Sequence, residues 1–239
     1  MGLRGPAPKR VEDRNGHRSR EEREGDDVTR VSQTVVTSGA ISQPQGSTKW
    51  DTVAKRIWKA AGTSAQSALY QETDWAVLRL MLDEVTAYRA ATKRNSQHLG
   101  AIMSALTDLL LCEGDRRRRG IEVARRDTPV KPPAASKDWD ADVRKLWRAM
   151  PRSEVTKFYE PTDWAVAHFL LSELSLFRSV PFRSGQLLTT LLVGLDSLML
   201  TEGKRRQLGL ETKKNVSAAP SGKSAGIIEM ETWRKKLGG

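Results

Sequence analysis

The sequence repeats itself at a fixed interval of 89 residues. Three tryptophan pairs have this spacing: Trp50 and Trp139, Trp58 and Trp147, Trp75 and Trp164. The copy runs without a gap, residues 50–122 against residues 139–211, and 26 of its 73 positions are identical. A copy of this length predicts that one folding unit is used twice in tandem.

The composition along the chain divides it into five parts. Residues 1–48 are poor in large apolar side chains and are expected to form a disordered, charged N-terminal arm. Helical repeat one follows at 49–127, a proline-bearing linker at 128–137 and helical repeat two at 138–214. Residues 215–239 are expected to form a flexible tail that ends in a short amphipathic helix.

Each repeat is expected to contain three helices, because apolar residues recur at three- and four-residue intervals. The three stripes of repeat one are Trp50, Val53, Ala54, Ile57, Trp58 and Ala61; Trp75, Leu78, Leu82, Val85 and Tyr88; and Leu99, Ile102, Met103, Leu106, Leu109 and Leu110. One residue of Thr73–Asp74, and of its copy Thr162–Asp163, is expected to cap the second helix, and Gly120 and Gly209 to end the third. The pattern predicts an all-α fold.

The third helix of repeat two, within residues 187–200, carries apolar side chains on more than one face. Burial between the two repeats and contact with another copy of the chain explain such a helix equally well. A three-helix unit of this size buries a modest core, which favours packing of the units on one another.

The composition excludes several kinds of site. A single cysteine, Cys112, excludes an intramolecular disulfide and a thiolate metal cluster. The three histidines, His17, His98 and His168, lack the spacing of zinc ligands. No apolar run is long enough to span a bilayer, and no apolar signal core follows the N-terminus. We therefore expect a soluble, intracellular chain with no metal, cofactor or catalytic residues.

The charge points to a polyanionic partner, nucleic acid first. The formal net charge is +11, and two basic clusters occupy matched places at the expected ends of the third helices. These DNA-binding candidates are Arg116, Arg117, Arg118, Arg119, Lys204, Arg205 and Arg206. Complementing a helix dipole is the alternative role, but four successive arginines exceed it, which favours contacts with DNA phosphates.

The N-terminal arm holds a second set of DNA-binding candidates. These are Arg4, Lys9, Arg10, Arg14, Arg18 and Arg20. Such an arm either tracks the DNA backbone or enters a minor groove, or it only keeps the chain soluble. The acidic run at residues 21–27 suggests a third role, in which it masks the arm when DNA is absent.

Three further motifs have a structural and a functional interpretation. The tryptophans are expected in the core rather than stacked on bases, because they share a helical register with aliphatic residues. Gly222–Ser224 resembles the end of a phosphate-binding loop, but Ser217 replaces the first glycine, which excludes an ATP site. The tail helix is a docking candidate for a partner protein or a neighbouring chain through Ile227, Met230, Trp233 and Leu237.

Six short segments, in their order and spacing, resemble the small subunit of the terminase of tailed bacteriophages, in the branch found in phages of actinobacteria. They are MGLRGPAPKR at 1–10, SAQSALYQETDWA at 64–76, LLCEGDRRR at 110–118, FYEPTDWA at 158–165, SGQ at 184–186 and LMLTEGKRR at 198–206. The family usually carries one such unit, and this chain carries two.

The resemblance implies a non-catalytic subunit of viral genome packaging. Such a subunit assembles into a homo-oligomeric ring, binds double-stranded viral DNA and delivers it to the terminase large subunit, in the host cell cytoplasm and without a cofactor or a membrane. The residues alone leave a helical DNA-binding transcriptional regulator, or a nucleic-acid architectural protein, as the alternative. An enzyme acting on nucleic acid is disfavoured, because metal ligands and a nucleophile constellation are missing.

Overall fold

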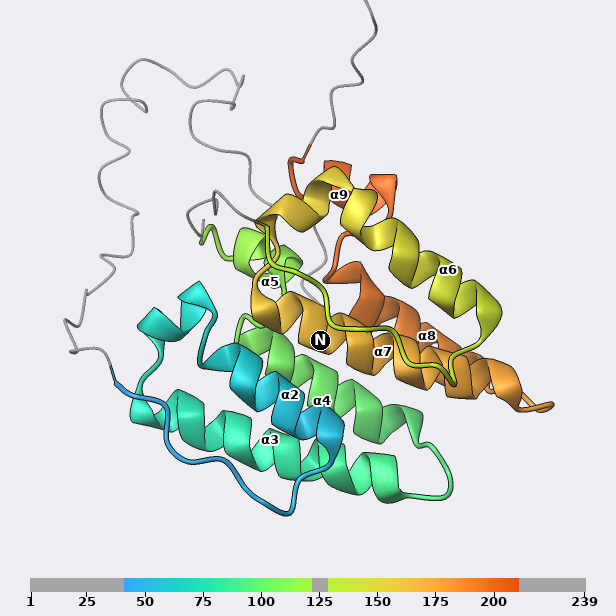
Figure 1. Cartoon of the computed structure of the whole chain (residues 1–239), viewed down its shortest axis with the longest axis horizontal. Coiled ribbons are helices and arrows are strands. Elements are labelled where there is room, and N and C mark those ends of the chain that lie inside the picture. Colours follow the sequence, from blue (N-terminus) through green and yellow to red (C-terminus); the bar gives the residue numbers. More distant parts are fainter. Residues whose placement is uncertain (1–40, 122–128, 211–239) are drawn as a thin grey trace, which may run out of the picture.

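The computed structural model describes residues 41–121 and 129–210, and every regular element in these ranges is helical, as predicted (Figure 1). Repeat one contains α2 (Thr52–Ala61), the 3-10 helix η3 (Ala65–Leu69), α3 (Glu72–Ala90), α4 (Ser96–Asp108) and α5 (Glu113–Arg118). Repeat two contains α6 (Ala141–Ala149), the 3-10 helices η4 (Met150–Arg152) and η5 (Glu154–Phe158), α7 (Pro161–Ser179), α8 (Gly185–Asp196) and α9 (Glu202–Gln207). Each element of repeat one has a counterpart that begins 89 residues later, which is consistent with the duplication.

The buried faces of the helices are those that the periodicity predicts. All residues of the first two stripes are buried, and so are the six tryptophans that the repeats share. In repeat one Trp75 makes edge-to-face contacts with Trp58 and Tyr70, at ring-centroid distances of 5.4 and 5.1 Å, and Trp164 makes the equivalent pair in repeat two. The core position of these tryptophans is confirmed, and base stacking is excluded for them.

The third helix of each repeat differs from the prediction. It stops before the basic cluster, which belongs to the separate helices α5 and α9. Leu110 and Met199 interrupt it with left-handed backbone angles, φ 59° and 50°, through which a right-handed helix does not continue. The hydroxyl of Tyr70 donates to the carbonyl of Leu109 beside this turn, and Tyr159 repeats the bond in repeat two. The expectation of one continuous third helix was therefore wrong.

The start of the second helix is also corrected. Its N-caps are Gln71 and Glu160, so Asp74 and Asp163 occupy the third helical position. There each carboxylate accepts a hydrogen bond from the backbone N–H of the N-cap, at 2.8 Å, which satisfies one of the amides that a helix start leaves open. The glycines expected to end α5 and α9 have left-handed angles, as predicted: φ +69° at Gly120 and +73° at Gly209.

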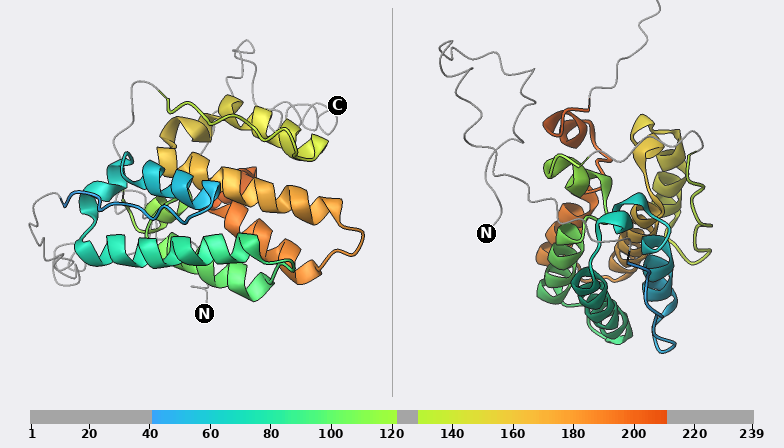
Figure 2. Two further views of the ribbon diagram at one scale, coloured as in Figure 1. Left: turned by 60° about the horizontal axis from the view of Figure 1, so that its bottom comes forward. Right: turned by 90° about the vertical axis from the view of Figure 1, so that its left-hand side faces the viewer.

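The two repeats share one hydrophobic core, with α7 in its middle (Figure 1). Helix α2 packs on α3 on one side and on α7 on the other, and α6 packs on the far side of α7, so these helices follow the order α3, α2, α7, α6 (Figure 2). Helix α8 packs on α4 and α7, while its Leu192 and Val193 are exposed. Burial between the repeats thus accounts for one apolar face of α8 and leaves the other outward.

Candidate nucleic-acid interface

The two basic clusters lie on α5 and α9, and both helices begin with a glutamate and end with arginine or lysine in the last turn. Helix α5 is fixed against repeat two, because the backbone N–H of Gly114 donates to the carbonyl of Ser197 at 2.9 Å. Ser197 follows α8 directly and precedes α9. This hydrogen bond therefore joins α5 of repeat one to the segment of repeat two that connects α8 to α9.

Arg116 is fully buried, so the structure corrects its assignment as a phosphate contact. Its guanidinium pairs with the carboxylates of Asp163 at 2.5 Å and Glu113 at 3.1 Å. Burial alone would lower the pKa of Arg116, but the two carboxylates raise it above its ordinary value, so the guanidinium stays charged inside the protein. Arg116 joins the two repeats rather than reaching a ligand.

The other three arginines of this cluster also have acidic partners. Arg117 pairs with Glu113 at 2.8 Å and lies 4.7 Å from the ring centroid of Phe158. Arg118 pairs with Asp115 at 2.7 Å, and Arg119 with Asp108 at 3.5 Å. Glu113 and Asp115 lie within one turn before the arginines, so the sequence itself offered them as partners. Asp163 could not be identified in this way, because it belongs to the other repeat.

The second cluster is more open. Lys204 pairs with Asp196, and Arg205 and Arg206 both pair with Glu202. Arg206 is the most accessible of the seven residues, with 72% of its side chain exposed, followed by Arg119 with 59%. Exposed ion pairs of this kind contribute at most about 1 kcal/mol, so a phosphate can compete for these arginines.

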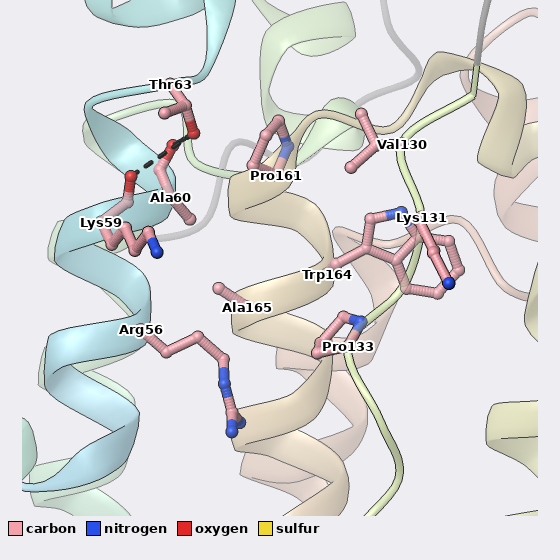
Figure 3. Close-up of a pocket in the computed structure, with 10 residues that line it drawn as sticks. All are labelled: Arg56, Lys59, Ala60, Thr63, Val130, Lys131, Pro133, Pro161, Trp164 and Ala165. Atoms are coloured by element: carbon pink, nitrogen blue, oxygen red, sulfur yellow. Dashed lines mark hydrogen bonds between the residues drawn. The ribbon is translucent and has the colours of Figure 1, made fainter.

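Sequence reasoning missed a third basic feature, an open pocket of about 370 Å³ between α2, α7 and the segment that precedes α6 (Figure 3). Its ten lining residues are Arg56, Lys59, Ala60, Thr63, Val130, Lys131, Pro133, Pro161, Trp164 and Ala165. They include three cations and no carboxylate, so the pocket suits an anion. Figure 3 shows Arg56 reaching from α2 toward α7. Burial lowers the pKa of Arg56, and its Nη1 atom is buried without a hydrogen-bond partner.

The remaining candidates lie outside the described residues. These are the arm residues Arg4, Lys9, Arg10, Arg14, Arg18 and Arg20 and the tail residues Ile227, Met230, Trp233 and Leu237.

The ranges 41–121 and 129–210 hold no group of three or more His, Cys, Asp or Glu side chains arranged to bind a metal ion. Burial raises the pKa of Cys112 well above its ordinary value, which suppresses the thiolate form. None of the helices described is long and apolar enough to cross a membrane.

The similarity of this chain to known proteins is divided between its two repeats. The family model of the phage terminase small subunit matches twice, over residues 3–129 and 123–238. The Gene 5 protein of Mycobacterium phage L5 is 32% identical over 135 residues, which cover 52% of this chain and 82% of that protein. The Gene 5 protein of Mycobacterium phage D29 is 31% identical over 130 residues, with the same coverage. No solved structure matches the chain.

The two family matches fall on the two halves of the chain, and each relative aligns along most of its own length to about half of this one. The resemblance found in the short segments is thereby confirmed. The chain belongs to the phage terminase small subunit family, whose members are the non-catalytic subunits of the terminase.

Proposed function

We propose that the chain binds double-stranded phage DNA and brings it to the terminase large subunit, as a homo-oligomeric ring in the host cell cytoplasm. The observation that carries this proposal is the family match over both halves of the chain. It favours genome packaging over the transcriptional regulator and the architectural protein, which the residues alone leave open.

The phosphate contacts are assigned to the accessible part of the two clusters. Arg118, Arg119 and Arg206 have exposed guanidinium groups, and their ion pairs are weak enough to be exchanged for phosphates. Arg117 is more covered and acts as a supporting charge. The basic pocket between α2 and α7 and the N-terminal arm would extend this contact along the DNA backbone.

A DNA titration at several salt concentrations tests this assignment. In the full chain, replacement of Arg118, Arg119 and Arg206 by glutamine should lower the slope of log K against log salt by about 2.7, because each phosphate contact contributes about 0.9. Replacement of Lys93 and Arg152, two exposed cations away from α5 and α9, is the matched control and should leave the slope unchanged. A wild-type chain that binds no DNA at low salt would overturn the proposed function.

The arm is tested in the same titration. Glutamine at the six candidate positions of the arm, Arg4, Lys9, Arg10, Arg14, Arg18 and Arg20, should lower the slope further if the arm tracks the DNA backbone. An unchanged slope would leave the arm with a solubilising role alone.

Docking to the large subunit is assigned to the C-terminal segment at residues 227–237, whose sequence pattern predicts an amphipathic helix. Replacement of Trp233 and Leu237 by alanine should abolish co-purification with the large subunit, since large apolar residues on one helical face are typical anchors for a groove. Thr232→Ala on the same segment is the control. A Trp233→Ala/Leu237→Ala variant that still binds the large subunit and stimulates its ATPase normally would refute this assignment.

A further inference from the structure

The interface between the two repeats is not symmetric. Glu173 on α7 pairs with Arg89 at 2.6 Å. A two-fold arrangement would also pair the shifted residues Glu84 and Arg178 with each other. Instead Glu84 binds His98 of its own repeat, and Arg178 binds Asp140 and Asp142 of its own repeat. The repeats therefore meet head to tail, and such an interface leaves one unmatched half on each repeat.

Repeat two contributes one face of α7 to this interface. The carboxylate of Glu173 forms an ion pair with Arg94 at 2.8 Å in addition to its pair with Arg89. Near the start of the helix, Thr162 accepts a hydrogen bond from the amide of Gln66 at 2.7 Å, and Asp163 receives Arg116. Thr162, Asp163 and Glu173 of α7 are thus each met by a partner from repeat one.

Helix α3 lies at the edge of the bundle (Figure 1), and the same face of α3 is largely exposed among the residues that the structure describes. We call this the outer α3 face: Thr73, Asp74, Val77, Leu80 and Glu84. Four of the five residues are identical to their counterparts on α7. Leu80 is 60% exposed and Val77 42% exposed, whereas the counterparts Phe169 and Val166 are fully buried.

Repeat two carries the complementary half on the opposite side of the molecule, around α6 and α9. We call this the outer repeat-two face: Ser153, Arg178, Arg183, Gly203, Lys204 and Arg205. Arg178 and Arg183 are the counterparts of Arg89 and Arg94. Arg205 is held by Glu202 and by the carbonyl of Met199, as Arg116 is held by Glu113 and by the carbonyl of Leu110. The groups that would receive another α3 face are therefore already in position.

A glycine on this face has no explanation among the described residues of the chain. At its counterpart Gly114 a Cβ atom would lie 2.6 Å from the carbonyl oxygen of Ser197, so the contact between the repeats requires glycine there. At Gly203, inside α9, a Cβ atom would meet no atom of residues 41–121 or 129–210 within 4 Å. Alanine is the better helix former at such a position, yet glycine is present. A copy of the Gly114 contact, made by a second molecule, would require it.

One pair of contact residues differs between the interface within the chain and the corresponding positions on the two outer faces, but the second pair is also complementary. Within the chain, Ser197 donates to the carboxylate of Asp115 at 2.8 Å. The shifted positions are Asp108 and Lys204, which bear opposite charges. Both lie at the surface or near it, so a second copy would bring an acid to a base at this point.

We propose that the outer α3 face of one chain packs on the outer repeat-two face of the next, which repeats the interface within the chain between two copies. Glu84 then pairs with Arg178 and Arg183 of the neighbour, and Asp74 with Arg205. This contact deepens the proposed homo-oligomer and rests on it. A head-to-tail contact closes into a ring or continues as a filament, because every copy offers both halves.

Gly203→Ala in the full chain tests the contact, with native mass spectrometry and sedimentation as readouts. The variant should fold with unchanged or higher thermal stability and should need about tenfold or more protein to assemble. Gly114→Ala, the same change at the matched position, should instead lower the stability of the fold itself. Assembly of Gly203→Ala at the wild-type concentration would overturn the contact, while a wild type that stays monomeric would overturn the proposed oligomer as well.

Charge reversal tests the direction of the contact. Glu84→Arg alone should fail to assemble, because the new cation then meets Arg178 and Arg183 at every interface. Arg183→Glu alone should need more protein to assemble than the wild type, because only Arg178 is left to attract Glu84. An equimolar mixture should assemble, since alternating copies restore an opposite-charge pair at each contact. Asp138→Arg, an exposed acid outside both faces, is the control and should assemble as the wild type does. A mixture that stays unassembled would overturn the pairing, and a DNA titration of the same samples measures the DNA function separately.

Discussion

Asp163→Asn tests how strongly the buried ion pair holds the two repeats together. The Asp163 carboxylate accepts hydrogen bonds from Arg116 at 2.5 Å and from the backbone N–H groups of Glu113 at 2.5 Å and Glu160 at 2.8 Å. Asparagine keeps the shape but removes the charge. Arg116 then remains fully buried with Glu113 as its one remaining carboxylate partner among the described residues. Removing one partner of a buried pair in this way costs about 3–5 kcal/mol of folding stability.

The duplication supplies the matched control, Asp74→Asn. Asp74 makes the same bond to its N-cap amide but pairs with no arginine of the described residues, so its replacement should cost about 1 kcal/mol, the typical value of a helix cap. The two free energies of unfolding are measured by urea titration, followed by tryptophan fluorescence, at a protein concentration low enough to keep copies apart. Equal costs for the two variants, or a cost below about 1 kcal/mol for Asp163→Asn, would refute the reasoning.

Three further outcomes follow from buried groups. Burial lowers the pKa of His168 to about 4, so the unfolded chain is protonated first as the pH falls below 6.5. Between pH 7 and pH 5 the wild type should therefore lose about 2 kcal/mol of stability that His168→Gln does not lose, measured by urea unfolding, and an equal loss in both would contradict this. Cys112 should react with a thiol reagent far more slowly in the folded chain than in urea, and similar rates would show that the site opens readily. Tyr159→Phe removes the bond to the carbonyl of Leu198 and should cost about 1–2 kcal/mol, as should Tyr70→Phe at the matched place, whereas two neutral changes would show that these bonds do not hold the turns.

Much of the helical architecture could be predicted because large apolar residues recur with the period of a helix. That pattern identified the buried stripes of α2 and α3 residue by residue, and glycines marked the ends of α5 and α9. The break before each basic cluster was not predictable in this way. Leucine and methionine occupy the left-handed positions at Leu110 and Met199, where glycine is the usual signal, and the tyrosine that bonds beside each turn lies 39 residues earlier in the sequence.

The candidate site shows a second limit of local pattern. Four successive arginines suggest a phosphate-binding surface, but the burial of Arg116 depends on Asp163, which is 47 residues away and belongs to the other repeat. Likewise the run TDWAV is identical at residues 73–77 and 162–166, yet Thr73 and Val77 are exposed while Thr162 and Val166 are buried. Whether this run is buried or exposed therefore depends on whether the other repeat packs on it. The sequence of the run itself does not contain that information.

The differences between α3 and α7 show which charges the interface permits. Helix α3 carries six charged residues and α7, in the middle of the core, carries three. Arg79 and Asp83 of α3 are replaced by the neutral His168 and Ser172, as expected where an unpaired charge would be buried. The charges that α7 keeps are all paired: Asp163 with Arg116, Glu173 with Arg89 and Arg94, and Arg178 with Asp140 and Asp142. Burial thus removes charges from α7 except where an opposite charge meets them.

Asp74 and Glu84 lie on the outer α3 face, and within the described chain neither is met by an arginine of another repeat. A neighbouring copy that presents Arg178, Arg183 and Arg205 would give both the partners that their counterparts have.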